Sequence, residues 1–85
     1  MANLENKSLD TRTFEEFCKG LTKREWTQVQ RDLSEILKRS FQCIYNWKRG
    51  VRMPSSNSER VKVSNYLNKK FNLNTRHWLL FPELL

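Results

Sequence analysis

Apolar residues recur every three or four positions along most of the chain, which is the spacing of one face of a helix. The longest stripe predicts a helix that ends at residue 37. Its members are Trp26, Val29, Leu33, Ile36 and Leu37. Shorter stripes predict a helix on either side, and they consist of Phe14, Phe17, Cys18 and Leu21, and of Val63, Tyr66, Leu67 and Phe71. No segment alternates with the period of a strand, so the pattern predicts an all-α fold.

Capping residues set the limits of these helices. Three pairs have the spacing of a capping box, namely Thr13 with Glu16, Thr22 with Glu25, and Ser56 with Glu59. Ser40 is placed to cap a further short helix that runs to Lys48 and stops by Gly50. We expect the fourth helix to span roughly Asn57 to Phe71, and residues 75–81 to add one or two turns.

The 85 residues are enough for one small domain. Residues 1–12 lack a period and predict a flexible N-terminal arm, whereas residues 13–85 predict a compact bundle of four to five helices. The tail after residue 77 is unusually apolar and has to be covered. Either it packs back on the bundle, or it forms a homodimer contact with a second copy through Trp78, Leu79, Leu80 and Phe81.

Positive charge is concentrated in the second half of the chain. The whole sequence holds 16 Lys and Arg against 9 Asp and Glu, a net charge of +7. Between residues 38 and 76, Glu59 is the single acid. The basic residues in that range are Lys38, Arg39, Lys48, Arg49, Arg52, Arg60, Lys62, Lys69, Lys70 and Arg76. This distribution favours a polyanionic partner, with nucleic acid ahead of an anionic membrane surface.

Other classes of protein find little support in the sequence. Cys18, Cys43 and His77 are too few and too scattered for a zinc site, and His77 has no catalytic companion nearby. We therefore expect no enzyme activity, no metal, no cofactor and no small-molecule substrate. The start of the chain has no apolar leader, and no stretch is long enough to span a membrane. With two unclustered cysteines, this predicts a cytoplasmic protein that does not bind membranes.

Residues 33–54 form the constellation that points to a function. A helix that ends at Leu37, a tight connection and a short helix opened by Ser40 together describe a helix-turn-helix. Ile44 and Trp47 are expected to anchor the second helix, with Val51 beyond them. The opposite stripe consists of Gln42, Tyr45, Asn46 and Arg49. Gln and Asn can each pair with an adenine edge in the major groove.

Two other interpretations of this stripe stay open. Phe41 and Tyr45 could belong to the core, with Trp47 turned outward, because aromatic residues at helical spacing usually pack. Gln42 and Asn46 could be ordinary polar residues of the surface.

The same residues resemble a known family. Leu33-Ser34, Leu37, the run from Ser40 to Gly50, Arg52 and Pro54 are similar to the lambda-repressor-like helix-turn-helix domains of phage repressors and Cro proteins. The segment Phe14-Glu15-Glu16-Phe17, followed by a long second helix, also resembles small Bacteroides-type regulators. Two positions depart from the family pattern. Lys38 stands where the turn usually has glycine, and Arg39 replaces an apolar residue, so we expect a wider or rotated turn.

The resemblance implies a role for each residue of the motif. Ser40 and nearby backbone amides would contact phosphate, and Lys48, Arg49 and Arg52 would grip the DNA backbone. The residues that would face the bases are Phe41, Gln42, Tyr45 and Asn46. The expected function is sequence-specific binding of double-stranded DNA by a transcriptional regulator of the phage or mobile-element type, associated with the nucleoid when bound. The alternative is a protein-interaction or RNA-binding module that uses the basic face.

Overall fold

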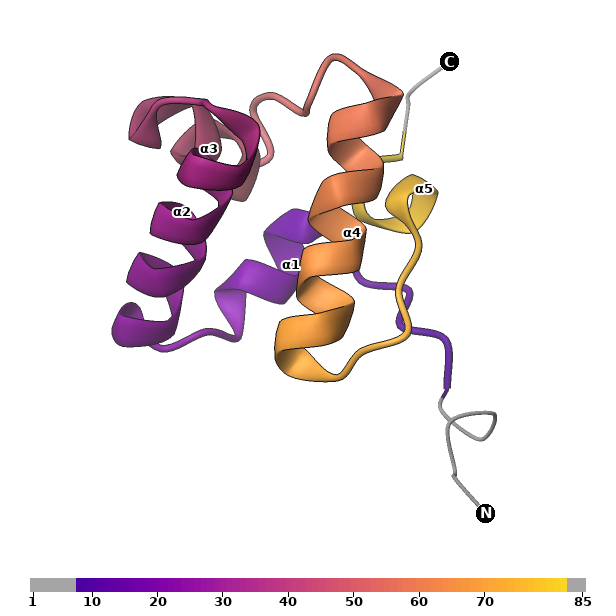
Figure 1. Ribbon diagram of the computed structural model, residues 1–85. Coiled ribbons are helices and arrows are strands. Elements are labelled where there is room, and N and C mark those ends of the chain that lie inside the picture. Colours follow the sequence, from indigo (N-terminus) through magenta and orange to yellow (C-terminus); the bar gives the residue numbers. More distant parts are fainter. Residues whose placement is uncertain (1–7, 83–85) are drawn as a thin grey trace.

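Five helices make up the fold in the computed structural model, which describes residues 8–82 (Figure 1). They are α1 (Phe14–Lys19), α2 (Lys23–Leu37), α3 (Phe41–Lys48), α4 (Asn57–Phe71) and α5 (His77–Leu80). Residues 8–82 contain no strand, only one isolated bridge between Asp10 and Thr75. In Figure 1, α2 and α3 lie together on one side of the molecule, α4 and α5 on the other, and α1 between them. The predicted all-α class is confirmed.

The predicted caps open the first four helices. Thr13 and Thr22 form complete capping boxes, each accepting a backbone N–H from the glutamate three residues on and donating its own to that carboxylate. The Ser40 hydroxyl accepts the N–H of Cys43 at 3.1 Å. Ser56 accepts the N–H of Glu59, but the Glu59 carboxylate turns to Arg39 instead of the Ser56 backbone. The third predicted capping box is therefore only half formed.

The core draws on every helix. The buried apolar residues are Phe14, Phe17, Cys18, Val29, Leu33, Leu37, Ile44, Trp47, Val63, Leu67, Leu80 and Phe81. Phe81 lies between two elements, with its ring 5.4 Å from that of Phe14 and 6.2 Å from that of Trp47. Within the described residues, the apolar tail is thus covered by the chain itself at Leu80 and Phe81.

Two predicted core positions are wrong. Ile36 is 45% exposed because α2 buries the row Val29, Leu33 and Leu37, and Ile36 lies beside that row. Val51 is 58% exposed and does not extend the anchor of α3. It follows Gly50, at which the chain turns, and it lines an open hollow together with Trp47 and Phe81.

Polar contacts tie the remaining segments to the bundle. The Tyr66 hydroxyl of α4 donates to the carboxylate of Asp32 in α2. Burial, together with this hydrogen bond, raises the pKa of Tyr66. Asp10 donates its backbone N–H to Asn74 at 2.8 Å, so the described part of the predicted arm is bound at this point. Residues 1–7 of that arm lie outside the described residues.

Candidate nucleic-acid interface

Helix α3 is seated on the core by two residues. Ile44 is fully buried and Trp47 is 3% exposed, as the spacing predicted. Phe41 is 54% exposed and Tyr45 39% exposed, on the side of α3 away from this anchor. The alternative that placed these two rings in the core and Trp47 outside is therefore wrong.

The outward side of α3 consists of two parallel rows. Phe41 and Tyr45 lie one turn apart and form an aromatic row. Gln42 and Asn46 also lie one turn apart and form an amide row, in which Gln42 Nε2 donates to Asn46 Oδ1 at 3.2 Å. Gln42 is exposed and Asn46 is half-buried. The structure thus brings together the four side chains that were predicted to contact bases.

Cationic side chains hold the aromatic row at the end of α3. Lys48 Nζ lies 5.8 Å from the ring centroid of Tyr45 and 5.4 Å from that of Trp26 in α2. Arg49 Cζ lies 5.7 Å from the centroid of Tyr45. Contacts of this kind between a cation and a ring face are attractive. Tyr45 therefore has two of the residues predicted to grip phosphate beside its ring.

Two residues of α2 belong to the site, although the sequence pattern did not place them there. Trp26 was expected only in the core stripe, yet it is half-buried and carries Lys48. Gln30 Nε2 donates to the backbone carbonyl of Phe41 at 3.1 Å and so fixes the start of α3 on α2. These contacts arise from the packing of α2 on α3. No local pattern in the sequence predicts them for either residue.

The turn before α3 keeps the geometry of a glycine turn without a glycine. Lys38 has φ 58° and ψ 44°, the left-handed region, and its N–H donates to the Ser34 carbonyl. Arg39 also donates its backbone N–H to that carbonyl, at 3.2 Å, and the Ser34 hydroxyl donates to the Arg39 carbonyl. The departures at Lys38 and Arg39 are therefore accommodated by a hydrogen-bonded turn of three residues.

Arg39 takes the place of an apolar plug by pairing with α4. Its Nε lies 2.7 Å from Glu59 Oε2 and its Nη2 lies 3.1 Å from Oε1. The hydrogen bond from Arg39 holds the pKa of Glu59 below its usual value. A two-pronged pair of this kind is directional, so it fixes the orientation of the turn as well as its distance from α4.

The end of α3 depends on Gly50. Its φ is 75°, and a Cβ there would lie 2.2 Å from Glu15 Oε1. Gly50 donates its N–H to Trp47, and Val51 donates its N–H to Asn46, which is the hydrogen-bond pattern of a Schellman motif. The second bond, together with one from the Arg52 N–H to the same Asn46 carbonyl, holds the start of the following loop against the backbone of α3.

A hollow of about 420 Å³ lies along one flank of α3, between this helix and the start of α4. It is lined by Arg39, Ser40, Gln42, Cys43, Asn46, Trp47, Arg52, Met53, Ser55 and Glu59. Ser40 and Arg52, two of the predicted phosphate contacts, thus share a hollow with the amide row. Lys48 and Arg49, the other two, gather around Tyr45. The four predicted phosphate contacts therefore fall into two pairs beside the two rows.

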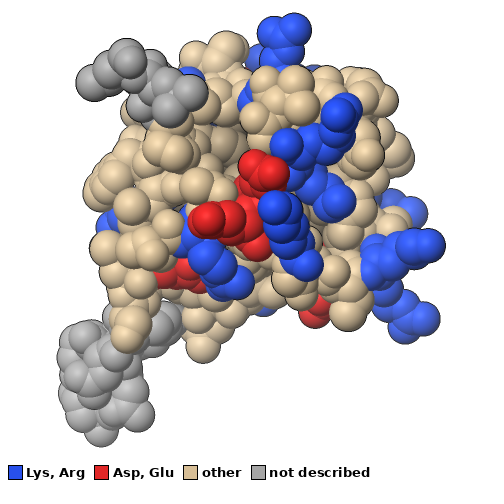
Figure 2. Space-filling model, turned by 180° about the vertical axis from the view of Figure 1, so that it is seen from behind, with Lys and Arg blue, Asp and Glu red and all other residues tan. Residues whose placement is uncertain are grey.

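Acidic and basic side chains are separated on the face of the molecule that Figure 2 shows. In the view of Figure 2, acidic side chains gather in the middle and basic side chains border them and line one edge. In α1, Glu15 pairs with Lys19 at 3.7 Å. Beside α3 the only acid of the basic segment, Glu59, is paired with Arg39. The surroundings of α3 thus keep an excess of positive charge.

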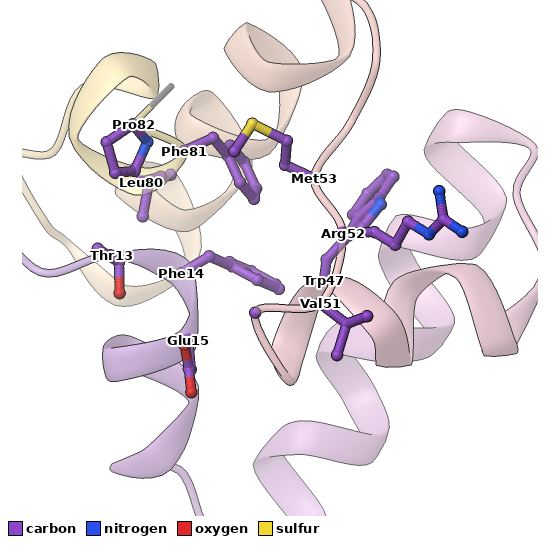
Figure 3. A pocket seen from close by; sticks show the side chains of 11 residues that line it. Thr13, Phe14, Glu15, Trp47, Val51, Arg52, Met53, Leu80, Phe81 and Pro82 are labelled. Atoms are coloured by element: carbon purple, nitrogen blue, oxygen red, sulfur yellow. The ribbon is translucent and has the colours of Figure 1, made fainter. Parts of the chain in front are cut away.

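A second hollow, of about 340 Å³, lies between α1, the loop after α3 and the end of α5 (Figure 3). Its walls are mostly apolar and include Phe14, Trp47, Val51, Met53 and Phe81. No cluster of three His, Cys, Asp or Glu side chains with the arrangement of a metal site exists among residues 8–82. Over the same residues, no helix has the length and apolar character needed to cross a bilayer.

Comparison of the chain with models of known protein families, with curated proteins and with solved structures finds no match in any of the three.

Proposed function

We propose that this protein binds double-stranded DNA in a sequence-specific manner by placing α3 in the major groove, and that it acts as a transcriptional regulator of the phage or mobile-element type. The observation that carries the proposal is the division of α3 into two sides. Ile44 and Trp47 are buried, whereas the aromatic and amide rows face outward with cations beside them. The major groove of B-DNA admits an α-helix, and base edges are read there by side chains of these types.

The two kinds of contact divide between residues. Ser40 at the start of α3, together with Lys48, Arg49 and Arg52, would contact phosphates and set the affinity. The base contacts would come from Phe41, Gln42, Tyr45 and Asn46. Phosphate contacts carry no sequence information, so specificity depends on the second set.

A pair of domains would strengthen binding, because one domain of this kind contacts only half a site. Of the four residues considered for a homodimer contact, Leu80 and Phe81 are 3% and 4% exposed and take part in the core. Trp78 is 58% exposed and Leu79 is half-buried. Trp78 and Leu79 are therefore the residues that a dimer contact would use.

The proposal is tested by the salt dependence of binding to duplex DNA. Fluorescence anisotropy of a labelled random-sequence duplex is measured between about 50 and 200 mM salt. We expect the logarithm of the binding constant to fall linearly with the logarithm of the salt concentration, because phosphate contacts release counterions. No binding at the lowest salt would overturn the proposal, and RNA and acidic proteins would then be tried on the basic face.

A matched pair of variants shows where the phosphate contacts lie. Arg52→Ala should weaken binding to every duplex and reduce the salt slope by about one. Lys69→Ala removes the same charge from the exposed end of α4 that points away from α3 (Figure 1), and it should leave the slope at the wild-type value. Equal effects of the two substitutions would mean that net charge, not the surface around α3, controls binding.

A further inference from the structure

The two rows of α3 differ in chemistry in a way that indicates which base pairs they suit. The amide row carries donors and acceptors, the aromatic row offers apolar ring surface, and none of the four positions holds a cation. Lys or Arg bound to guanine O6 and N7 is the commonest specific contact in the major groove. The four outward positions of α3 lack that contact.

The nearby cations do not supply a guanine contact at the centre of the helix. Lys48 is half-buried and lies over Trp26 and Tyr45, and Arg49 follows the last residue of α3, with its guanidinium near the Tyr45 ring. Both cations are one turn or less from the end of the helix, where the DNA backbone is the nearer partner in the proposed pose.

The amide row is already set for adenine. The hydrogen bond to Asn46 uses one of the two N–H groups of Gln42 and favours one orientation of its amide group. Gln42 keeps its carbonyl oxygen and its second N–H, which is the pair that matches the N6 amino group and N7 of adenine. Asn46 keeps both of its N–H groups for an acceptor on the neighbouring base pair.

The aromatic row suits thymine. The C5 methyl group of thymine is the one apolar group that a standard base presents in the major groove, and Phe is among the side chains that contact it. Phe41 is exposed at the first turn of α3, and its backbone is held by Gln30. Tyr45 continues the row one turn later, with Lys48 and Arg49 beside its ring.

We propose that α3 selects a run of A·T pairs through their major-groove edges, with Gln42 on adenine and Phe41 against thymine methyl groups. This inference rests on the proposed DNA-binding function. It adds the class of sequence that the site takes.

The test compares three duplexes with the same random flanks and a central block of A·T, G·C or inosine·cytosine pairs. An inosine·cytosine pair has the major-groove edge of G·C and the minor-groove edge of A·T. We expect the A·T block to bind about tenfold more tightly than either of the others, with the same salt slope for all three.

Each other result has a separate meaning. If inosine·cytosine binds as tightly as A·T, the preference arises from the minor groove or from the shape of the duplex, and the inference is wrong. Equal binding of all three blocks, or a preference for G·C, overturns the inference and leaves duplex binding in place. If none of the duplexes binds at the lowest salt, the proposed function fails together with the inference.

Base analogues and variants then test which base group each row of α3 contacts. Replacement of thymine by deoxyuridine removes only the methyl group and should weaken the wild-type protein about threefold or more, but should not affect Phe41→Ala. Leu9→Ala removes another exposed apolar side chain, outside α3, and should respond to deoxyuridine as the wild type does. Equal sensitivity of wild type and Phe41→Ala to deoxyuridine would contradict the contact.

The amide row is tested by changing its hydrogen-bond polarity. Gln42→Glu removes the donor to adenine N7 and should move the preference toward cytosine, whose amino group donates in the major groove. Gln42 is exposed, so the variant should fold as the wild type does. An unchanged preference for adenine at its position would exclude Gln42 as the residue that reads it.

Discussion

The connections after α2 and after α4 begin alike and are held by different means. Lys38 and Asn72 both take the left-handed conformation, with φ 58° and 57°. After α2, the turn is tied to α4 by the ion pair between Arg39 and Glu59, whose side chains are 44% and 14% exposed. After α4, the Asn68 side chain makes two hydrogen bonds to the backbone of buried Thr75, at 2.9 and 3.1 Å.

The two connections differ in the solution conditions that weaken them. Neutral hydrogen bonds to a buried backbone respond little to salt or pH. A partly exposed ion pair is screened by salt and is lost when its carboxylate is protonated. The connection that orients α3 is therefore the one that responds to ionic conditions, whereas the connection that closes the other side of the bundle does not.

The largest effect on stability is expected for the neutral hydrogen bonds between Asn68 and Thr75. Asn68→Ala leaves the N–H of Thr75 without its partner in a buried place and removes one of the two donors to the Thr75 carbonyl, which keeps Arg76 Nη1 at 3.2 Å, so the free energy of unfolding should fall by about 2 kcal/mol. Denaturant unfolding at two salt concentrations measures this loss, which should be the same at both. Asn65→Ala, an exposed position of the same helix, serves as the control and should change stability by less than about 0.5 kcal/mol. A loss that shrinks at high salt would contradict the comparison.

The ion pair between Arg39 and Glu59 should make the stability of the fold depend on pH. The folded-state pKa of Glu59 is lowered, so its contribution is present above the unfolded-state value of about 4.3 and is lost as the pH falls through the folded-state pKa. Because the pair is partly exposed, we expect this contribution to be below about 1 kcal/mol. Thermal unfolding from neutral pH into the acid range measures it.

Glu59→Gln isolates this contribution from other carboxylates. The pKa of Asp10 is also lowered, chiefly by its hydrogen bond from Arg12, and it titrates in wild type and variant alike. The difference in stability between the two proteins should therefore shrink as the pH falls and be reduced by high salt. A difference that stays constant from neutral pH into the acid range would mean that the ion pair does not stabilise the turn.

A smaller effect is expected from the backbone of the same turn. Lys38→Gly relieves the left-handed strain but adds freedom to the unfolded chain, so it should stabilise the fold by about 0.5 kcal/mol. Asn72→Gly should gain less, because asparagine tolerates this conformation better than lysine. Chemical unfolding of both variants ranks them. A larger gain at Asn72 than at Lys38 would contradict the assignment of strain.

The smallest effect is expected at the Thr75 hydroxyl, which is buried and has no hydrogen-bond partner among residues 8–82. Thr75→Val keeps the shape of the side chain and removes an unpaired polar group, so stability should be unchanged or rise by less than about 0.5 kcal/mol. The melting temperature of the variant measures this. A marked fall would show that the hydroxyl has a partner, such as a bound water.

Local rules predicted the helices of this protein well. The bounds of α4 agree with the prediction, and Thr13, Thr22 and Ser40 cap the helices they were expected to cap, because capping depends on residues within three positions of each other. The anchor of α3 at Ile44 was predicted for the same reason, since its spacing from Trp47 is a property of one helix.

The errors arise where a side chain has partners in two helices. Glu59 had a local partner in the Ser56 backbone, and the guanidinium of Arg39, distant in sequence, took its carboxylate instead. Ile36 fits the period of α2, but whether a position beside the buried row is covered depends on the neighbouring helices. Trp26 likewise joined the α3 surface through Lys48. These contacts depend on tertiary packing, which the spacing of apolar residues along the sequence does not predict.

The central claim, that the surface around α3 contacts duplex DNA, is tested most directly by the reactivity of Cys43. Cys43 lies in α3, half-buried, and lines the hollow shared with Gln42 and Asn46. Cys18, the other thiol, is 2% exposed, and burial raises its pKa to about 12, so an alkylating reagent should modify Cys43 first. Mass spectrometry follows the rate of alkylation with and without saturating duplex.

We expect the bound duplex to slow alkylation of Cys43 several-fold, while the intact protein alone reacts at this thiol and the unfolded protein at both. An unchanged rate at a DNA concentration where anisotropy shows full binding would contradict the claim, because the duplex would then occupy a surface other than the one around α3.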